Sequence, residues 1–394
     1  MQRRHFLAGA GGLAAAAWGL APAIVRAQPS GPIRVGIAAD LTGALSFTGG
    51  TFPKMAQLIA DEINGAGGLL GRRLEVITED TGTNEAISVT AARKLVEAHN
   101  VDVVIGGITS SARNAIADVV VGRGKRIYIY PMSSEAITCR PLLFATGATT
   151  AQQTSLLIPY VRSTGARRYA LLGSNYIWPQ TFNESARADI LKAGGEVVVE
   201  QLFPLDQLEF GPVINSILSN KVDLVLSSVI PPGLAPLFKG LYESGYQKKG
   251  GRTACVFYDE SLMTLTPPEE VEGLIGCADY FPAVGAAGDE ATKGLVDAYA
   301  RAFPGTLLTS SSGATGIFRG FKLWAAAVAS AGTLDSAAVA AALRHGKLTE
   351  GPGTPAEVDP SFQRCAMKMY VAVARNGAFD VVSQSDGLRA PGSC

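Results

Sequence analysis

One glycine-rich segment carries serines at the point where a strand is expected to end and a helix to begin. Gly106-Gly-Ile-Thr-Ser-Ser-Ala-Arg113 directly follows the apolar run 101–105. Ser110 or Ser111 is suited to cap the next helix, and the exposed backbone N–H groups of such a turn bind a carboxylate or carbonyl oxygen. The residues alone leave two interpretations open: a serine that only caps its own helix, and a serine that binds a ligand.

Aromatic residues end or follow two further apolar runs. Tyr130 closes the run 127–130 and continues as Pro-Met-Ser-Ser-Glu135, and Gly173-Ser-Asn-Tyr-Ile-Trp-Pro179 follows the run 169–172. An aromatic side chain at a strand end usually belongs to the core. A place in a ligand-binding cleft is the alternative interpretation.

Two carboxylates, Asp259 and Glu260, follow a fourth apolar run at 255–258. A carboxylate there would accept hydrogen bonds from an amide NH₂ group or, more strongly, from an α-ammonium group. A solvated loop explains the pair equally well. We expect Arg113 to face solvent or to order its loop, although a guanidinium is also able to grip a ligand carboxylate with two hydrogen bonds.

The motifs of common enzymes and metal sites are missing from the sequence. It contains no GxSxG and no GxxxxGK[ST], and its five cysteines have no CxxC spacing. We therefore predict no catalytic residues, no metal and no cofactor. Cys255 and Cys277 are the preferred disulfide pair, because adjacent parallel strands would bring them close, with buried free thiols as the alternative.

The elements that must position these residues alternate between strand and helix. Apolar β-branched runs are separated by segments with apolar residues every three or four positions. We expect strands at 33–38, 74–79, 101–105, 127–130, 169–172, 196–202, 224–229, 255–258, 274–278, 367–374 and 379–382. We expect helices at 55–63, 85–98, 113–121, 181–193, 210–219, 234–244, 291–302 and 315–331. This alternation predicts an α/β protein with doubly wound sheets and right-handed crossovers.

The first 27 residues have the composition of an export signal. Arg3 and Arg4 precede a weakly apolar run rich in Ala and Gly, and Val25-Arg-Ala27 ends it with a small residue. This pattern predicts a cleaved signal peptide of the twin-arginine type at 1–27, with the general secretory route and a retained anchor as alternatives.

Length and charge limit the class of the remaining chain. About 365 residues exceed one hydrophobic core and predict two domains. The chain has 34 basic and 34 acidic residues; the leader holds three arginines and no acid, so the mature protein carries a formal charge of −3. Without a cluster of basic residues, no nucleic-acid partner is expected.

Three segments together resemble one family of proteins. Ala60-Asp-Glu-Ile-Asn-Gly-Ala-Gly-Gly-Leu-Leu-Gly-Arg72, Asp40-Leu-Thr-Gly43 and Ile105-Gly-Gly-Ile-Thr-Ser-Ser111 resemble the N-terminal third of type I periplasmic solute-binding proteins of ABC importers. The similar branch is the Leu/Ile/Val-binding family, with its urea and short-chain amide binders. The Tyr130-Pro and Gly173-Ser-Asn-Tyr segments resemble cleft segments of the urea and amide binders, although Met132-Ser-Ser departs from their pattern.

The resemblance implies two doubly wound Rossmann-like lobes joined by a hinge of three segments, near 147, 281 and 348. The N-terminal lobe is expected at 31–147 plus 281–347, and the C-terminal lobe at 148–280 plus 348–394. It also implies a periplasmic location, an inner-membrane ABC permease as partner, and no membrane span in the mature chain. The ligand favoured by the resemblance is urea or a short-chain amide.

The resemblance and the strand ends together select the expected ligand-binding residues. Ser46 and Phe47, in the first loop, are weaker candidates. The main candidates are Ile108, Ser110, Ser111, Tyr130, Met132, Ser133, Tyr176, Trp178, Asp259, Glu260 and Phe281.

Two other functions remain open. A branched-chain or other amino acid is the alternative ligand, and in that case Asp259 or Glu260 would pair with the α-ammonium group. A protein of another class, an amide sensor that regulates transcription, shares the fold but works in the cytoplasm, so the leader argues against it.

The twin-arginine assignment predicts that replacing Arg3 and Arg4 by lysine blocks export, because this route recognises the arginine pair. Mass spectrometry of exported wild-type protein should find Gln28 as the first residue. Unchanged export of the lysine variant would favour the general secretory route.

Overall fold

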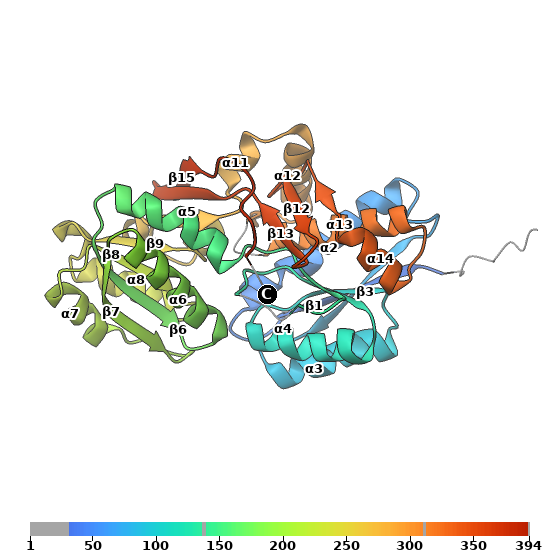
Figure 1. Ribbon diagram of the computed structural model, residues 1–394, viewed down its shortest axis with the longest axis horizontal. Coiled ribbons are helices and arrows are strands. Elements are labelled where there is room, and N and C mark those ends of the chain that lie inside the picture. Colours follow the sequence, from blue (N-terminus) through green and yellow to red (C-terminus); the bar gives the residue numbers. More distant parts are fainter. Residues whose placement is uncertain (1–30, 136–138, 310–312, 393–394) are drawn as a thin grey trace, which may run out of the picture. The chain divides into compact units, whose positions relative to one another are not determined.

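The structure is a computed structural model that describes residues 31–135, 139–309 and 313–392. The predicted signal peptide at 1–27 lies outside these residues. The described chain forms two mixed β-sheets with helices packed on them (Figure 1). The predicted α/β class with two doubly wound sheets is therefore confirmed.

The first sheet has the strand order β11-β12-β13-β5-β4-β3-β1-β2. Its strands β1 to β5 run parallel to one another, and their interiors are apolar because both faces are covered. The strands are β1 (Ile33–Ala39), β2 (Leu74–Asp80), β3 (Val103–Gly106), β4 (Ile127–Tyr130), β5 (Leu143–Ala145), β11 (Lys347–Leu348), β12 (Ala356–Asp359) and β13 (Arg364–Met367).

Helices cover both faces of this sheet. α3 packs on α4, and α13 packs on α2 and α14 (Figure 1). The fully buried Phe52, Met55 and Ile59 recur every three to four residues along α2, which explains why this segment is a helix facing the core. The helices are α1 (Ser46–Gly49), α2 (Thr51–Gly65), α3 (Glu85–Arg93), α4 (Ser110–Ala117), α12 (Glu290–Ala302), α13 (Ala314–Ala331) and α14 (Ser336–Leu343), with π-helical turns η1 (Lys94–Ala98) and η2 (Asp118–Arg123).

The second sheet has the order β15-β14-β10-β9-β8-β6-β7, with β6 to β10 parallel and β14–β15 added as an antiparallel hairpin. Its strands are β6 (Arg168–Ser174), β7 (Glu196–Phe203), β8 (Leu224–Ser228), β9 (Arg252–Cys255), β10 (Ile275–Ala278), β14 (Tyr370–Arg375) and β15 (Ala378–Gln384). Its helices are α5 (Thr150–Ser163), α6 (Ile177–Lys192), α7 (Gly211–Ser219), α8 (Leu234–Glu243), η3 (Gln247–Lys249), α9 (Glu260–Met263), α10 (Pro268–Val271) and α11 (Pro282–Ala286).

Both sheets have the same order in their parallel part. The first strand of each set lies between the second and the third, in β2-β1-β3 and again in β7-β6-β8. At such a switch point the connections leave the two neighbouring strands toward opposite faces, and a crevice opens beyond their carboxyl ends. Each sheet therefore offers a crevice, beside β1 and β3 in the first and beside β6 and β8 in the second.

The chain passes between the sheets at three places. It leaves the first sheet after β5, leaves the second after β10, and passes from β13 to β14 at Lys368 and Met369. We expected the third crossing near 348 and the whole of 348–394 in the second lobe, but β12 and β13 belong to the first sheet. The expected strand 367–374 combines the last residue of β13 with most of β14. Both segments are apolar, so the sequence pattern did not separate them.

The remaining differences from the expected elements concern short or unusual segments. The sequence did not reveal β5, β11 or β12, because two to four residues carry too little periodicity. It also did not reveal α5, which contains Pro159 and begins inside the expected linker with a capping box formed by Thr149 and Gln152.

The preferred disulfide between Cys255 and Cys277 is wrong: both thiols are free and buried, as is Cys365. In the sheet Cys255 lies opposite Gly276, so Cys277 is one position further and its side chain points to the other face. Cys139 is disulfide-bonded.

Among the described helices, none alone is long and apolar enough to span a membrane. α13 and α14 pass this test only as a pair, with a bend of 114° between them.

Gly106, at the end of β3, has φ of 140°, and a Cβ there would lie 2.0 Å from the carbonyl oxygen of Ala38. We predict that Gly106→Ala lowers the free energy of unfolding by about 3 kcal/mol or more, because the clash adds to the backbone strain. The control is Gly67→Ala, where φ is 103° but no atom lies within 4 Å, with an expected loss of about 1 kcal/mol. Equal losses in urea denaturation would show that the close approach to Ala38 is unimportant.

Candidate functional site

Loops from the carboxyl ends of strands in both sheets line one pocket. Its empty volume is about 330 Å³, open solvent at the mouth included. The loops follow β1, β3 and β4 in the first sheet and β6, β8 and β9 in the second. The lining residues are Leu45, Ile108, Met132, Ser133, Tyr176, Trp178, Ile230 and Phe257. The pocket thus lies where both strand orders switch, the place at which open α/β sheets bind ligands.

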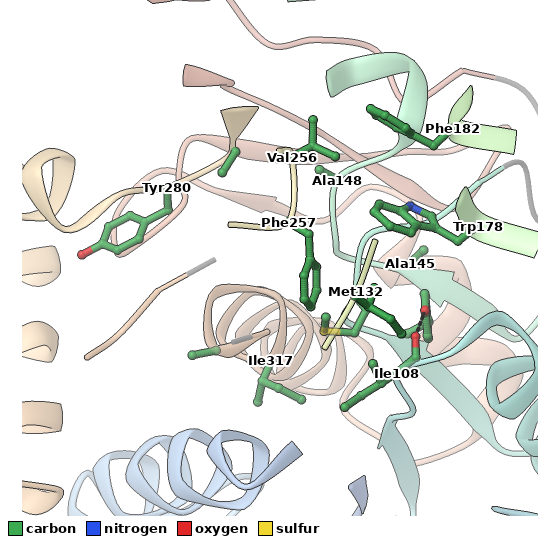
Figure 2. Close-up of a cluster of buried hydrophobic side chains, with 14 of the residues drawn as sticks. Ile108, Met132, Ala145, Ala148, Trp178, Phe182, Val256, Phe257, Tyr280 and Ile317 are labelled. Carbon is green, nitrogen blue, oxygen red and sulfur yellow. Dashed lines mark hydrogen bonds between the residues drawn. The ribbon is translucent and has the colours of Figure 1, made fainter. Parts of the chain in front are cut away.

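Aromatic side chains form the wall contributed by the second sheet. Trp178 stacks on Phe182 with ring centroids 5.8 Å apart and meets the edge of Phe257 at 6.3 Å. Figure 2 shows the Trp178 and Phe257 side chains above Met132 and Ile108, so the apolar cluster continues from the second-sheet loops to the first-sheet loops. Trp178 is 4% exposed, and its Nε1–H has no acceptor among the described residues. Trp178 thus lines the pocket and also carries a buried donor without an acceptor.

Two buried tyrosines hold the loop that follows β3. The Tyr128 hydroxyl donates to the carbonyl oxygen of Gly106 at 3.0 Å, and the Tyr130 hydroxyl donates to that of Ile108. Burial raises the pKa of Tyr130, so its hydroxyl keeps the proton that makes this hydrogen bond. Ile108, a lining residue, is thus fixed by a side chain from the neighbouring strand.

A buried ion pair lies behind this loop. Arg113, in the first turn of α4, is 2% exposed, and its Nη2 lies 2.5 Å from Oε1 of Glu135. Ser110 Oγ donates to the other carboxylate oxygen of Glu135 at 3.1 Å, and the Arg113 guanidinium lies 5.1 Å from the centre of the Tyr130 ring. Arg113 therefore does not face solvent, and its buried ion pair agrees with the other expectation, that it orders its loop. Its Nη1 has no partner within the described part of the chain.

Further titratable groups surround this pair. Burial, and then the charge of Arg113, lower the pKa of the buried Arg364 to about 10, and the carboxylate of Glu135 acts in the opposite direction. Asp40 also acts on Tyr130, and burial raises the pKa of Asp40 itself. Tyr176 reaches the cluster from the second sheet: burial, Tyr130 and Glu135 all raise its pKa.

Most of the predicted site residues come together. Five of them line the pocket: Ile108, Met132, Ser133, Tyr176 and Trp178. Ser110 and Tyr130 are buried directly behind it, through their bonds to Glu135 and Ile108. Ser111 is exposed on α4 with its Oγ 3.2 Å from Thr109 Oγ1, and Thr109, rather than either serine, caps the helix.

The two carboxylates and Phe281 lie elsewhere in the second lobe. Asp259 caps α9 by accepting hydrogen bonds from the backbone N–H and hydroxyl of Ser261. Glu260 accepts a hydrogen bond from the backbone N–H of Phe379 at 3.2 Å. Phe281 is fully buried against the Phe379 ring. The structure does not place these three residues among those that line the pocket.

Several pocket residues were not selected from the sequence. Phe257 was assigned to a strand expected at 255–258, but β9 ends at Cys255, so Phe257 already belongs to the loop that reaches the pocket. Leu45 takes the place that was expected for Ser46 or Phe47. Ile230 stands in a loop that the strand ends had indicated, but its apolar side chain gave no chemical signal.

The buried Glu260 makes stability depend on pH. Burial, and then Asp259, raise its pKa from 4.5 to about 7. The folded state therefore binds more protons than the unfolded state between these pH values, and the free energy of unfolding should fall by up to about 3 kcal/mol as pH rises from 4.5 to 7. Glu260→Gln should flatten this slope in denaturant titrations, whereas the exposed control Glu350→Gln should keep it. An equally steep slope in Glu260→Gln would remove Glu260 as the cause.

Comparisons with known proteins agree with this geometry. The sequence is 28% identical over 232 residues to a Leu/Ile/Val-binding protein of Rhizobium johnstonii, and 24% identical over 245 residues to an amino acid binding protein of Pseudomonas aeruginosa. These alignments cover 58% and 61% of this chain and 58% and 65% of the relatives, so the chain matches about three fifths of their length.

Solved structures match over nearly the whole fold. A solute binding protein of an ABC transporter from Rhodopseudomonas palustris, in complex with 3,4-dihydroxybenzoic acid, superposes with a TM-score of 0.80 at 22% identity, covering 91% of this chain and 99% of that one. The branched-chain amino acid transporter substrate binding protein of Streptococcus pneumoniae, in complex with isoleucine, gives 0.78 at 21% identity, covering 89% and 99%.

The family assignment comes from a longer match. A family model described as periplasmic binding protein matches residues 32–378, which include both sheets up to β14 and every residue that lines the pocket. The resemblance read from the sequence is confirmed at this level: the chain belongs to the periplasmic binding protein family.

Proposed function

We propose that this chain is the extracytoplasmic substrate-binding protein of an ABC importer. It binds a small solute between its two lobes in the periplasm and presents the closed form to an inner-membrane permease. The family, the predicted leader and a pocket built from the loops of both sheets support this proposal. It assigns no catalytic residue and no cofactor to the chain.

The ligand we propose is a small carboxylic acid with a planar, apolar body. The observation that carries this choice is Trp178, a pocket-lining residue whose buried Nε1–H has no acceptor among the described residues, next to Tyr176, Phe257 and aliphatic side chains. Aromatic walls favour a planar apolar body, which packs face or edge against the rings. A buried donor without an acceptor favours a ligand that brings an oxygen, since an unmade hydrogen bond is costly.

The buried Arg113 favours a negative charge on that ligand. It lies behind the pocket wall, and its Nη1 has no hydrogen-bond partner among the described residues. An unpaired guanidinium N–H behind an apolar wall attracts an anion more strongly than it would in water, because the local dielectric constant is low. The backbone N–H groups at the start of α4 add to this attraction.

A branched-chain amino acid is the second candidate. The names of the relatives and the aliphatic residues Leu45, Ile108 and Ile230 favour it. Its α-ammonium group needs an acceptor of negative charge, but the described residues that line the pocket carry no charge, and Glu135 is already engaged by Arg113 and Ser110. A branched-chain amino acid is therefore a less favoured ligand than a simple carboxylic acid.

Urea or a short-chain amide, favoured by the Tyr130-Pro and Gly173-Ser-Asn-Tyr segments, is the third. Such a solute has hydrogen-bonding groups on nearly every side. The pocket lining offers few partners for them, so several would be buried unpaired at a cost of about 1 to 3 kcal/mol each. An amide sensor of the same fold would differ from all of these by working in the cytoplasm.

Calorimetric titration of the mature protein with benzoate, 4-hydroxybenzoate, leucine, acetamide and urea tests the ligand class. We expect the benzoates to bind and urea not to bind. Binding of leucine alone would select the amino acid, and binding of acetamide or urea would select the amide.

Trp178→Phe keeps an aromatic ring and removes the indole N–H. We expect a loss of affinity for the bound carboxylic acid of roughly 5- to 150-fold, which corresponds to one buried hydrogen bond. The matched control is Trp324→Phe on α13, a buried tryptophan that does not line the pocket. Its affinity should equal that of the wild type. If both variants bind as tightly as the wild type, Trp178 Nε1 does not contact the ligand.

A further inference from the structure

One buried arginine joins two of the three crossings between the sheets. Arg319, on α13, is 1% exposed. Its Nε and Nη2 donate to the carbonyl oxygen of Thr146 at 2.8 and 2.6 Å, just after β5. Its Nη1 bonds to the Asp279 carboxylate, just after β10, and to the carbonyl oxygen of Gly353 at 3.2 Å. We call Arg319, Asp279, Thr146 and Gly353 the hinge cluster.

The partners of Arg319 belong to different lobes. α13 packs on the first sheet, whereas Asp279 directly extends β10 of the second. The ion pair between Arg319 and Asp279 is therefore a link between lobes within the hinge, and Thr315 Oγ1 strengthens it by donating to the same carboxylate oxygen at 3.1 Å. We propose that this ion pair sets the balance between the open and closed arrangements of the two lobes.

The hinge cluster is in direct contact with the pocket wall. Thr146 donates its backbone N–H to the carbonyl oxygen of Tyr130 and its hydroxyl to that of Gly316. α13 approaches this segment so closely that a Cβ on Gly316 would lie 1.9 Å from the carbonyl oxygen of Pro131. Pro131 precedes Met132, which lines the pocket. A rotation at the hinge cluster is thus transmitted to the pocket through packed backbone.

Empty space lies beside the hinge cluster. A cavity of about 850 Å³, part of it open to solvent, is lined by Tyr280 and Tyr370, which follow the second and third crossings, and by Gly353. Figure 2 shows the Tyr280 side chain pointing away from Trp178 and Phe257. The cavity and the pocket have no lining residue in common, and the cavity leaves room for one lobe to turn against the other.

The test measures the distance between the lobes in the ligand-free protein. Spectroscopic labels are attached through non-natural amino acids at the exposed positions Arg93, on α3, and Lys192, at the end of α6, because the chain has native cysteines. The main variant replaces Arg319 by Met and Asp279 by Leu together, since removing both charges avoids leaving one buried and unpaired. The matched control, Lys322→Met with Glu62→Gln, breaks an ion pair between α13 and α2 within the first lobe.

We expect the main variant to broaden the distance distribution and to raise the minor population at least about fivefold, while the control keeps the wild-type distribution. A folded main variant with an unchanged distribution overturns the proposal. If the main variant does not fold, Arg319→Lys decides: it keeps the charge beside Asp279 but loses the two-pronged bond to Thr146, and it should give a smaller shift in the same direction. An unchanged distribution in folded Arg319→Lys then overturns the proposal as well.

This inference rests on the proposed closure of the lobes but not on the identity of the ligand. The distance measurement needs no ligand, so it remains decisive even if every compound in the titration panel fails to bind. Conversely, an unchanged distance distribution leaves the binding assignment standing and removes only the role of the Arg319–Asp279 pair. A purely structural role for Arg319 would lower the melting temperature without changing the distribution.

Discussion

The structure depends on one constraint: parallel strands end along the same edge of a sheet, and their connections must cover both of its faces. In both sheets the first strand lies between the second and the third, so the connections on either side of it leave in opposite directions. The crevice that results is a consequence of strand order and needs no special residue. Because the chain builds this order twice, a pocket lined by loops of both sheets follows from topology, and the side chains only determine what fits into it.

The buried charges are the second feature that organises the molecule. Two ion pairs, Arg113–Glu135 and Arg319–Asp279, are almost fully removed from solvent. Burying a charge is expensive, and an ion pair rarely repays the full cost relative to apolar packing. Both pairs lie where the lobes meet, one behind the pocket and one in the hinge. Their positions favour a role in binding and movement over a role in stability alone.

The sequence contained most of the information on fold and about half of that on the site. Apolar runs located the buried strands well, since β4 and the long β1 and β2 begin and end within one residue of their expected bounds. Short strands such as β5 and β11 contain too few residues to show a period. The segment 367–374 is an apolar run interrupted only by Lys368, although the chain changes sheets there, because a run of apolar residues does not show which sheet each residue joins.

The sequence-based prediction missed site residues in two situations. In one a strand ends earlier than expected, and in the other a charged residue is buried. β9 ends three residues earlier than expected, so Phe257 and not Asp259 lines the pocket. The wall at this point is therefore aromatic, whereas the sequence predicted an acidic one. Arg113 looked like a surface residue because its partner, Glu135, is 22 positions away and on another element. A ligand class inferred from sequence segments thus depends on details that only the packed structure contains.

The proposed roles of the two buried pairs connect ligand binding with lobe closure. A ligand in the pocket would contact loops of both lobes and would therefore stabilise the arrangement in which those loops face each other. The hinge cluster contacts the pocket wall along a short, tightly packed path through Thr146, Gly316 and Pro131. If the lobes close as proposed, the pocket and the hinge act on one equilibrium through this path, so a change at either site shifts the affinity or the population at the other.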